Sequence, residues 1–241
     1  MDDRYFLRIR LIDLLVGDWD RHSGQWRWAR DGDQWRAIPE DRDWAFARMD
    51  GFVGGLARLF VPKYVGFSDE FPAISRLAEQ ADRIDHRVLG RLKLEDFLAV
   101  AREVQAALTD SVIEAAVGAL PEAYLEVERT HLVNALTSRR TELEEYTGAY
   151  YRHVMKQVRV YGFTNSADVV EFDQVTDSTA RVRLHAGSPT GPVTFERVIN
   201  GRETKEVELF IEEGKDQITG NDNLPFKVSM GESPKTEEEE D

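Results

Sequence analysis

The sequence contains no cysteine among its 241 residues. Disulfides, thiol catalysis and thiolate metal sites are therefore excluded, whereas the compartment stays open, because cytosolic and exported proteins alike can lack cysteine. No apolar run approaches the roughly 20 residues that a helix needs to cross a bilayer. An acidic start with no small-residue cleavage site after an apolar run also argues against a signal peptide. We expect no direct membrane insertion by this chain.

Positively charged residues are fewer than negatively charged ones. Lysine and arginine number 31 against 45 aspartates and glutamates, which gives a formal net charge of −14. Nucleic acids and anionic membranes bind basic stripes, so we expect no nucleic-acid partner. The last five residues are all acidic, and residues 231–241 are expected to form a disordered, solvated tail.

The first part of the chain has helical periodicity. Apolar residues recur at helical spacing from Tyr5 to Val16, with Asp2 or Asp3 as the capping residue and Gly17 as the end. Two short aromatic segments follow, and the Asp31-Gly32 pair between them predicts a β-hairpin. Helical patterns then dominate from about residue 71 to residue 156.

The period changes to two from Val158 onward. Six short alternating runs, separated by turn residues, predict a small antiparallel β-sandwich or barrel. We therefore predict an α+β protein with a mostly helical domain over residues 1–157 and a small all-β domain over residues 158–230.

A cluster of charged and amide side chains follows the first predicted helix. Phosphoryl transfer needs a carboxylate to orient the attacking hydroxyl, and an amide oxygen with a second carboxylate to hold Mg²⁺ against the phosphates. Protein kinases place these groups as an aspartate, four residues, an asparagine, a strand pair and a second aspartate. Here Asp20 is followed after four residues by Gln25, then by the hairpin, and then by Asp41 and Asp43. We expect the hairpin to bring the second pair of acids back beside the first loop.

All five tryptophans lie in the same stretch. Trp26, Trp28 and Trp44 are spaced as packing residues, whereas Trp19 and Trp35 are expected to be exposed.

The segments "GDWDRHSGQWRW" and "AIPEDRDWAF" resemble the catalytic core of the atypical kinases. These include the spore-coat CotH kinases, the secretory-pathway casein kinases and the phosphoinositide lipid kinases. The wider chain is similar, in patches over most of residues 4–228, to a bacterial group in which a CotH-like segment precedes a small β domain. That group occurs within long exported proteins that also carry a metallophosphoesterase domain and an outer-membrane barrel. The resemblance implies a kinase C-lobe-like fold, ATP-dependent phosphotransferase chemistry, and an exported, periplasmic or outer-membrane-associated location.

The resemblance also implies a role for each matching residue. Asp20 takes the position of the catalytic aspartate, and Arg21 and His22, which follow it, would be structural or phosphate-facing. Gln25 takes the metal-binding amide position, and Asp41 matches the aspartate of the metal-binding turn. Mg²⁺ with ATP would be the cofactor, with Asp43 as a further metal ligand.

The sequence departs from the kinase pattern at two points. Gln25 is one methylene longer than the usual asparagine. There is also no G-x-G-x-x-G loop and no V-A-I-K-like strand, which in kinases belong to the N-lobe that covers the phosphates. We therefore expect a kinase-like module that is either a fragment of a longer protein or the remnant of a lost two-lobed enzyme, and that is inactive alone.

Two other interpretations remain open. The charged residues after the first helix fit a structural salt-bridge cluster under an aromatic lid, in a pseudokinase and β-domain scaffold for protein interaction within an exported assembly. The oxygen-rich turn from Asp216 to Asn223 could instead bind Ca²⁺ in an extracellular interaction domain, although Asn-Asp turns are common without metal. The expected partners are thus a nucleotide or other proteins.

Overall fold

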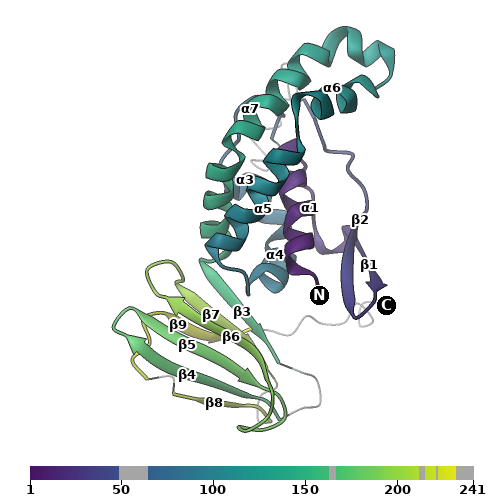
Figure 1. Cartoon of the computed structure of the whole chain (residues 1–241). Helices are drawn as coiled ribbons and strands as arrows, with labels where there is room; N and C mark the ends of the chain where they lie inside the picture. Colours follow the sequence, from purple (N-terminus) through teal and green to yellow (C-terminus); the bar gives the residue numbers. More distant parts are fainter. Residues whose placement is uncertain (49–64, 163–166, 212–214, 221, 232–241) are drawn as a thin grey trace, which may run out of the picture. The chain divides into compact units, whose positions relative to one another are not determined.

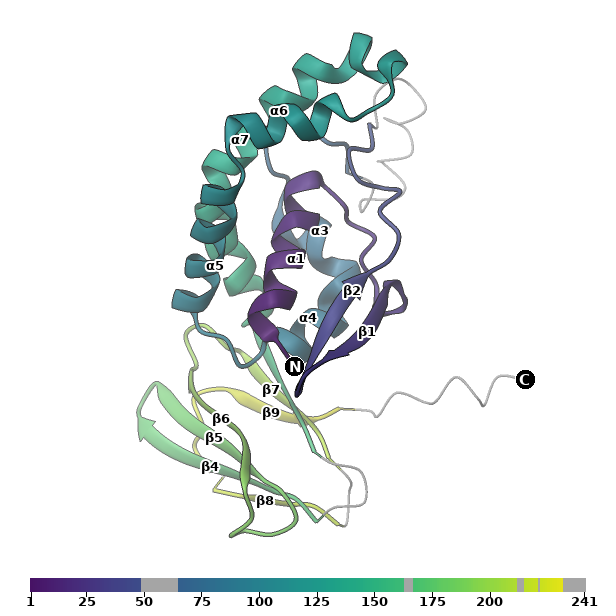
Figure 2. The same ribbon diagram turned by 45° about the vertical axis from the view of Figure 1, so that its right-hand side comes forward.

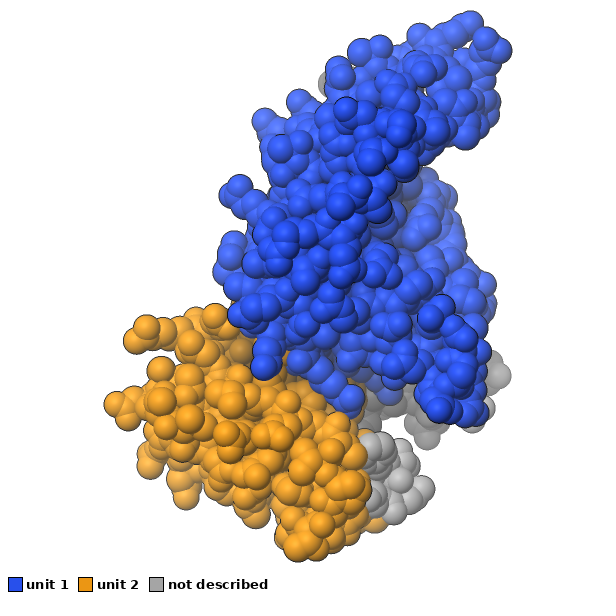
Figure 3. Space-filling view, viewed as in Figure 1, with its two compact units in different colours: residues 1–153 blue, residues 154–241 orange. Residues whose placement is uncertain are grey.

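The computed structural model describes residues 1–48, 65–162, 167–211, 215–220 and 222–231. The protein is α+β, and it folds into two compact units, residues 1–153 and 154–241 (Figure 3). The boundary between them falls at the end of the longest helix, a few residues before Gln157. Of the acidic tail predicted for residues 231–241, only Gly231 lies within the described residues.

Unit 1 combines one hairpin with several helices (Figures 1 and 2). Its elements are α1 (Asp3–Val16), the 3₁₀ turn η1 (Ser23–Gln25), β1 (Trp26–Asp31), β2 (Gln34–Pro39), α3 (Ile74–Ala78), the 3₁₀ turn η2 (Glu79–Ala81), α4 (Asp82–Leu89), α5 (Leu94–Ala107), α6 (Asp110–Gly118) and α7 (Glu122–Val154). Among the described residues, no helix has the length and apolar character needed to cross a membrane.

The predicted first helix is confirmed as α1. It begins where Asp2 Oδ1 accepts a hydrogen bond from the Tyr5 amide at 2.9 Å, and it ends at Gly17, whose φ of 75° is the left-handed conformation that glycine adopts without strain. The helix packs against α4, α5 and β2 (Figure 2). Each of its fully buried leucine and phenylalanine side chains contributes about 1.5–3 kcal/mol, and these are Phe6, Leu7, Leu11 and Leu14.

The predicted hairpin is also confirmed. Strands β1 and β2 pair antiparallel from Trp26↔Pro39 to Asp31↔Gln34, and Gly32 in the connecting turn has a φ of 59°. The hairpin starts directly after Gln25 and ends directly before Glu40. It therefore returns the chain to the loop from which it departed.

The described residues of unit 2 form two sheets, whose strands are labelled in Figure 1. One has the strand order β3-β7-β9 and the other β6-β5-β4-β8. The strands are β3 (Gln157–Tyr161), β4 (Val169–Thr176), β5 (Thr179–His185), β6 (Val193–Asn200), β7 (Glu206–Phe210), β8 (Gln217–Thr219) and β9 (Lys227–Met230).

The two sheets of unit 2 share one core. Burial alternates along β3, β5 and β7, so each sheet buries one face. The ring of Phe172 on β4 lies 6.3 Å, centroid to centroid, from Phe226, which directly precedes β9 in the other sheet. This arrangement is a small β-sandwich.

The prediction of an antiparallel sandwich is wrong in its strand directions. The pairs β4–β5 and β5–β6 are antiparallel, but β3–β7, β7–β9 and β4–β8 are parallel. Parallel neighbours need a long connection, and the three strands β4 to β6 lie between β3 and β7 in the sequence. Local turn signals predict hairpins, but they contain no information on such distant pairings.

Candidate functional site

The loop after α1 has a buried side and an exposed side. Asp18 is 1% exposed and Arg21 is fully buried, whereas Asp20 is half-buried and His22 is exposed. The loop thus presents Asp20 and His22 toward its surface while its other charged residues lie in the interior.

Arg21 contacts groups inside the protein. Its Nη2 pairs with Asp18 Oδ2, its Nη1 donates to the backbone carbonyl of Glu40, and its Nε lies 3.2 Å from Asp13 Oδ2. The Nε contact is an ion pair only, since this nitrogen has no hydrogen-bond partner among the described residues. Of the two roles predicted for Arg21, these contacts are those of a structural residue.

His22 serves the local turn. Its Nδ1 accepts a hydrogen bond from the Gly24 amide at 3.1 Å, so the imidazole caps η1. The 3₁₀ turn η1 then places Gln25 at the start of the hairpin.

Gln25 is connected to the second acidic segment. The Glu40 amide donates to the Gln25 carbonyl at 2.9 Å, and Asp41 follows immediately. The side-chain Oε1 of Gln25 is buried and has no hydrogen-bond partner among the described residues. A buried acceptor without a partner is costly, and a ligand reaches this oxygen only if the Gln25 side chain moves.

The second acidic segment forms a turn with exposed carboxylates. Asp41 adopts a φ of 54°, and its Oδ1 accepts from the Asp43 amide at 3.1 Å. Both side chains are exposed. The Phe46 amide donates to the Val16 carbonyl at 2.9 Å, which connects the end of this turn to the end of α1.

The oxygen donors of this region suit a metal bound mainly by phosphates. Within the described ranges, no group of three or more His, Cys, Asp or Glu side chains is placed to hold a metal ion by itself. Mg²⁺ on a nucleotide, however, takes only one or two carboxylates from the protein and the rest from phosphates and water. The Gln25 Oε1 atom and the carboxylates of Asp41 and Asp43 are oxygen ligands of the type that Mg²⁺ prefers.

A buried charge cluster lies beneath the loop and the turn. It consists of three arginines and three aspartates, namely Arg10, Arg21, Arg42, Asp13, Asp18 and Asp85. Arg10 Nε donates to Asp85 Oδ1 at 2.9 Å, and the Tyr150 hydroxyl also donates to Asp85. All members are buried except Arg42, which is half-exposed.

Burial shifts the titration of several of these groups. It raises the pKa of Asp18 above the ordinary aspartate value, while the Arg21 guanidinium acts in the opposite direction. It likewise raises the pKa of Asp85, opposed by Arg10. Burial opposes the charged form of Arg10 as well, but Asp85, Tyr150 and Asp13 outweigh it, and the pKa of Arg10 lies well above its usual value.

Sequence reasoning missed Arg10, Asp13 and Asp85. The signal that was available is their spacing, because Arg10 and Asp13 interrupt the apolar residues of the predicted first helix three positions apart. Charged residues within a core-facing stripe are rarely buried unless they are paired.

The tryptophan predictions hold in part. Trp26 is 4% exposed and Trp35 is 49% exposed, as expected. Trp19 is wrongly predicted to be exposed, since only 2% of its surface is accessible. It packs against Trp44, with ring centroids 4.7 Å apart.

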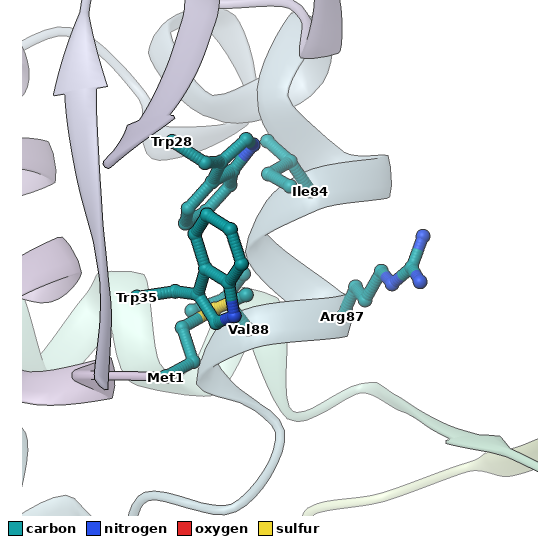
Figure 4. Close-up of a pocket in the computed structure, with 6 residues that line it drawn as sticks. All are labelled: Met1, Trp28, Trp35, Ile84, Arg87 and Val88. Carbon is teal, nitrogen blue, oxygen red and sulfur yellow. The ribbon is translucent and has the colours of Figure 1, made fainter. Parts of the chain in front are cut away.

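An apolar cavity of about 360 Å³ lies beside the hairpin (Figure 4). Its lining residues are Met1, Trp28, Trp35, Ile84, Arg87 and Val88. Figure 4 shows the Arg87 side chain pointing away from the two tryptophans. None of the residues predicted for phosphoryl transfer lines this cavity.

The predicted Ca²⁺ turn lies in unit 2, and its Asn221 is outside the described residues. Asp216 Oδ1 accepts from the Asp168 amide at 2.8 Å, and the buried Asp168 accepts from the Gly187 amide at 3.0 Å. The carboxylates of Asp216 and Asp168 therefore fix the ends of strands.

Comparisons with protein-family models, with curated proteins and with solved structures found no match.

Proposed function

We propose that unit 1 is a kinase C-lobe-like module, of the CotH-like and atypical-kinase type, that binds Mg²⁺ with the phosphates of ATP. Asp20 would orient the acceptor hydroxyl, and Gln25 and Asp41, with Asp43, would hold Mg²⁺–ATP. One observation carries the proposal: two hydrogen bonds at Glu40 join the Asp20–Gln25 loop to the segment that contains Asp41. Arg21 Nη1 donates to the Glu40 carbonyl, and the Glu40 amide donates to the Gln25 carbonyl.

The element order supports the same proposal. Helix α1, the Asp20–Gln25 loop, the β1–β2 hairpin and the Asp41 turn follow one another in the chain. This is the order of the catalytic loop, strand pair and metal-binding turn in protein kinases. The orphaned Gln25 Oε1 atom adds an oxygen donor at the position where kinases use an asparagine.

The chemistry assigned to these residues is positional and electrostatic. Bound Mg²⁺ would neutralise charge on the phosphates. The half-buried Asp20 carboxylate would accept the proton of an acceptor hydroxyl, and the exposed acids of the turn would fix the phosphates relative to it. The sequence has no counterpart of the lysine and glycine-rich loop that cover the phosphates in kinases, so we expect weak nucleotide affinity and no transfer by this module alone.

Thermal unfolding with and without ligands tests the proposal. A ligand that binds the folded state raises the melting temperature. ATP with Mg²⁺ should raise it by at least about 1 °C at millimolar concentration, and Ca²⁺ alone should not. Asp41→Ala should abolish the rise. Asp33→Ala, which removes the same charge from the exposed hairpin turn, should leave the rise intact.

A second candidate is a non-catalytic scaffold for protein interaction within an exported assembly. The complete burial of Arg21 among aspartates favours it, because those contacts need no ligand. The absence of any melting-temperature shift with nucleotide and metal would contradict the kinase-like proposal and support this one.

A further inference from the structure

Three arginines from different parts of unit 1 contact one buried carboxylate. Asp13, on the last turns of α1, is fully buried. Its Oδ2 lies 3.2 Å from both Arg10 Nη1 and Arg21 Nε, and its Oδ1 accepts from Arg42 Nε at 3.1 Å. A single side chain thus joins α1, the loop after it and the turn that follows the hairpin.

Two of these arginines connect Asp13 to the second acidic turn. Arg21 also donates to the carbonyl of Glu40, which directly precedes Asp41. Arg42 lies between Asp41 and Asp43 in the sequence, and its bond to Asp13 engages its guanidinium with α1 rather than with the neighbouring acids. Asp13 therefore acts on both ends of the short segment 40–42.

We propose that Asp13 is a positioning residue that sets the location of the Asp41 turn relative to Gln25. This inference rests on the proposed function, in which the Asp41 turn holds Mg²⁺. In this role Asp13 fixes Arg21 and Arg42, and through them it fixes the carboxylates that would hold Mg²⁺, without contacting metal or phosphate itself. A buried ion-paired carboxylate suits this task. A conformation that lost one partner would contain an uncompensated buried charge, so the conformation in which all partners are paired is strongly favoured.

The cluster offers a matched control. Asp85 is also buried, and in the part of the chain that the structure describes its arginine partner is Arg10, on α1. Asp13→Asn and Asp85→Asn each remove one buried negative charge. If Asp13 were merely structural, the two variants would weaken unit 1 in the same general way.

Amide hydrogen exchange of the full chain, measured by NMR, separates the two roles. The reporters are the amides of Glu40 and Phe46, which bond to the Gln25 and Val16 carbonyls at 2.9 Å. In the Asp13→Asn variant, exchange at the Glu40 and Phe46 amides should accelerate about tenfold more than exchange at the amides of the β1–β2 ladder. The reason is that the turn would open locally more often than the whole unit unfolds. Asp85→Asn should accelerate all of these amides together. Equal acceleration in the Asp13→Asn variant would overturn the inference.

A second variant covers the case in which Asp13→Asn does not fold. Arg42→Gln changes a half-exposed side chain and removes only one of the two connections. Exchange should accelerate at Phe46 and stay slow at Glu40, where Arg21 still holds the carbonyl. Unchanged exchange at Phe46 would contradict the positioning role.

Binding of Mn²⁺–ATP to the same variants distinguishes the two proposals. Loss of binding in Asp13→Asn but not in Asp85→Asn supports both. If the wild type binds no metal nucleotide, the proposed function fails, and the exchange result alone decides whether Asp13 positions the turn.

Discussion

Arg21 illustrates how one side chain can determine the geometry of a loop. Its guanidinium is fully buried and contacts Asp13, Asp18 and the Glu40 carbonyl. Desolvating a cation is costly unless carboxylates and carbonyls replace the lost water. The loop conformation that provides all of these partners is therefore strongly preferred, and Asp20 is held at the surface as a consequence.

The pH dependence of stability tests the state of Asp18. Because burial raises its pKa, the folded state binds this proton more tightly than the unfolded state. The stabilisation that comes from protonated Asp18 is fully present below the pKa that this group has in the unfolded chain. It is lost as the pH rises through the pKa that the group has in the folded protein. The loss in unfolding free energy caused by Asp18→Asn should thus be larger at pH 4 than at pH 7, as measured by urea denaturation. A larger loss at pH 7 would mean that the Arg21 ion pair outweighs burial.

At the scale of elements, the C-terminal end of α1 depends on α7. Arg139 of α7 donates to the Leu14 and Leu15 carbonyls from Nη1, and to Ser68 and Glu70 carbonyls from its other nitrogens. Its guanidinium also lies 4.3 Å from the Phe67 ring centroid. Burial lowers the pKa of Arg139 to about 10, which leaves it charged at neutral pH.

Arg139→Met should therefore destabilise unit 1 by about 2–4 kcal/mol, because several buried carbonyls lose their donor. Arg102→Met is the control, since Arg102 forms an exposed ion pair with Glu144 that contributes at most about 1 kcal/mol. Chemical denaturation measures both values. Equal losses would show that the α1 carbonyls find other partners.

The elements differ in how far the sequence predicts them. Asp2, Gly17 and the Asp31-Gly32 pair act within a few residues of themselves, so α1 and the hairpin followed directly from local rules. The role of Asp13 depends on Arg42, 29 residues away, and no local pattern encodes that contact. The exposure of Trp19 was mispredicted for the same reason, because its partner Trp44 lies beyond the hairpin.

At the scale of the whole molecule, the chain consists of two units with separate cores. The core of unit 2 contains apolar side chains from both sheets, among them Val160, Phe172, Val182 and Leu209. The parallel pairings of this unit cannot be predicted from turn residues. The six alternating runs correspond to β3, β4, β5, β6, β7 and β9, whereas β8 (Gln217–Thr219) lies in the stretch predicted as a Ca²⁺-binding turn.

Residues 154–241 should fold as an isolated fragment, because the apolar faces of both sheets cover each other. Its unfolding should be cooperative, and Phe172→Ala should destabilise it by about 3–5 kcal/mol. Circular dichroism with urea denaturation checks both expectations. A fragment without a cooperative transition would show that unit 2 requires unit 1.

We propose that the loop of Asp20 and Gln25 and the turn of Asp41 form a site for Mg²⁺ and phosphates. Paramagnetic Mn²⁺–ATP, titrated into the ¹⁵N-labelled full chain, tests this most directly because it broadens only the amide resonances near the bound ion. We expect broadening at Gln25, Asp41 and Asp43, its loss in Asp41→Ala, and its retention in Asp33→Ala. Broadening elsewhere, or equal broadening in the two variants, would contradict this site.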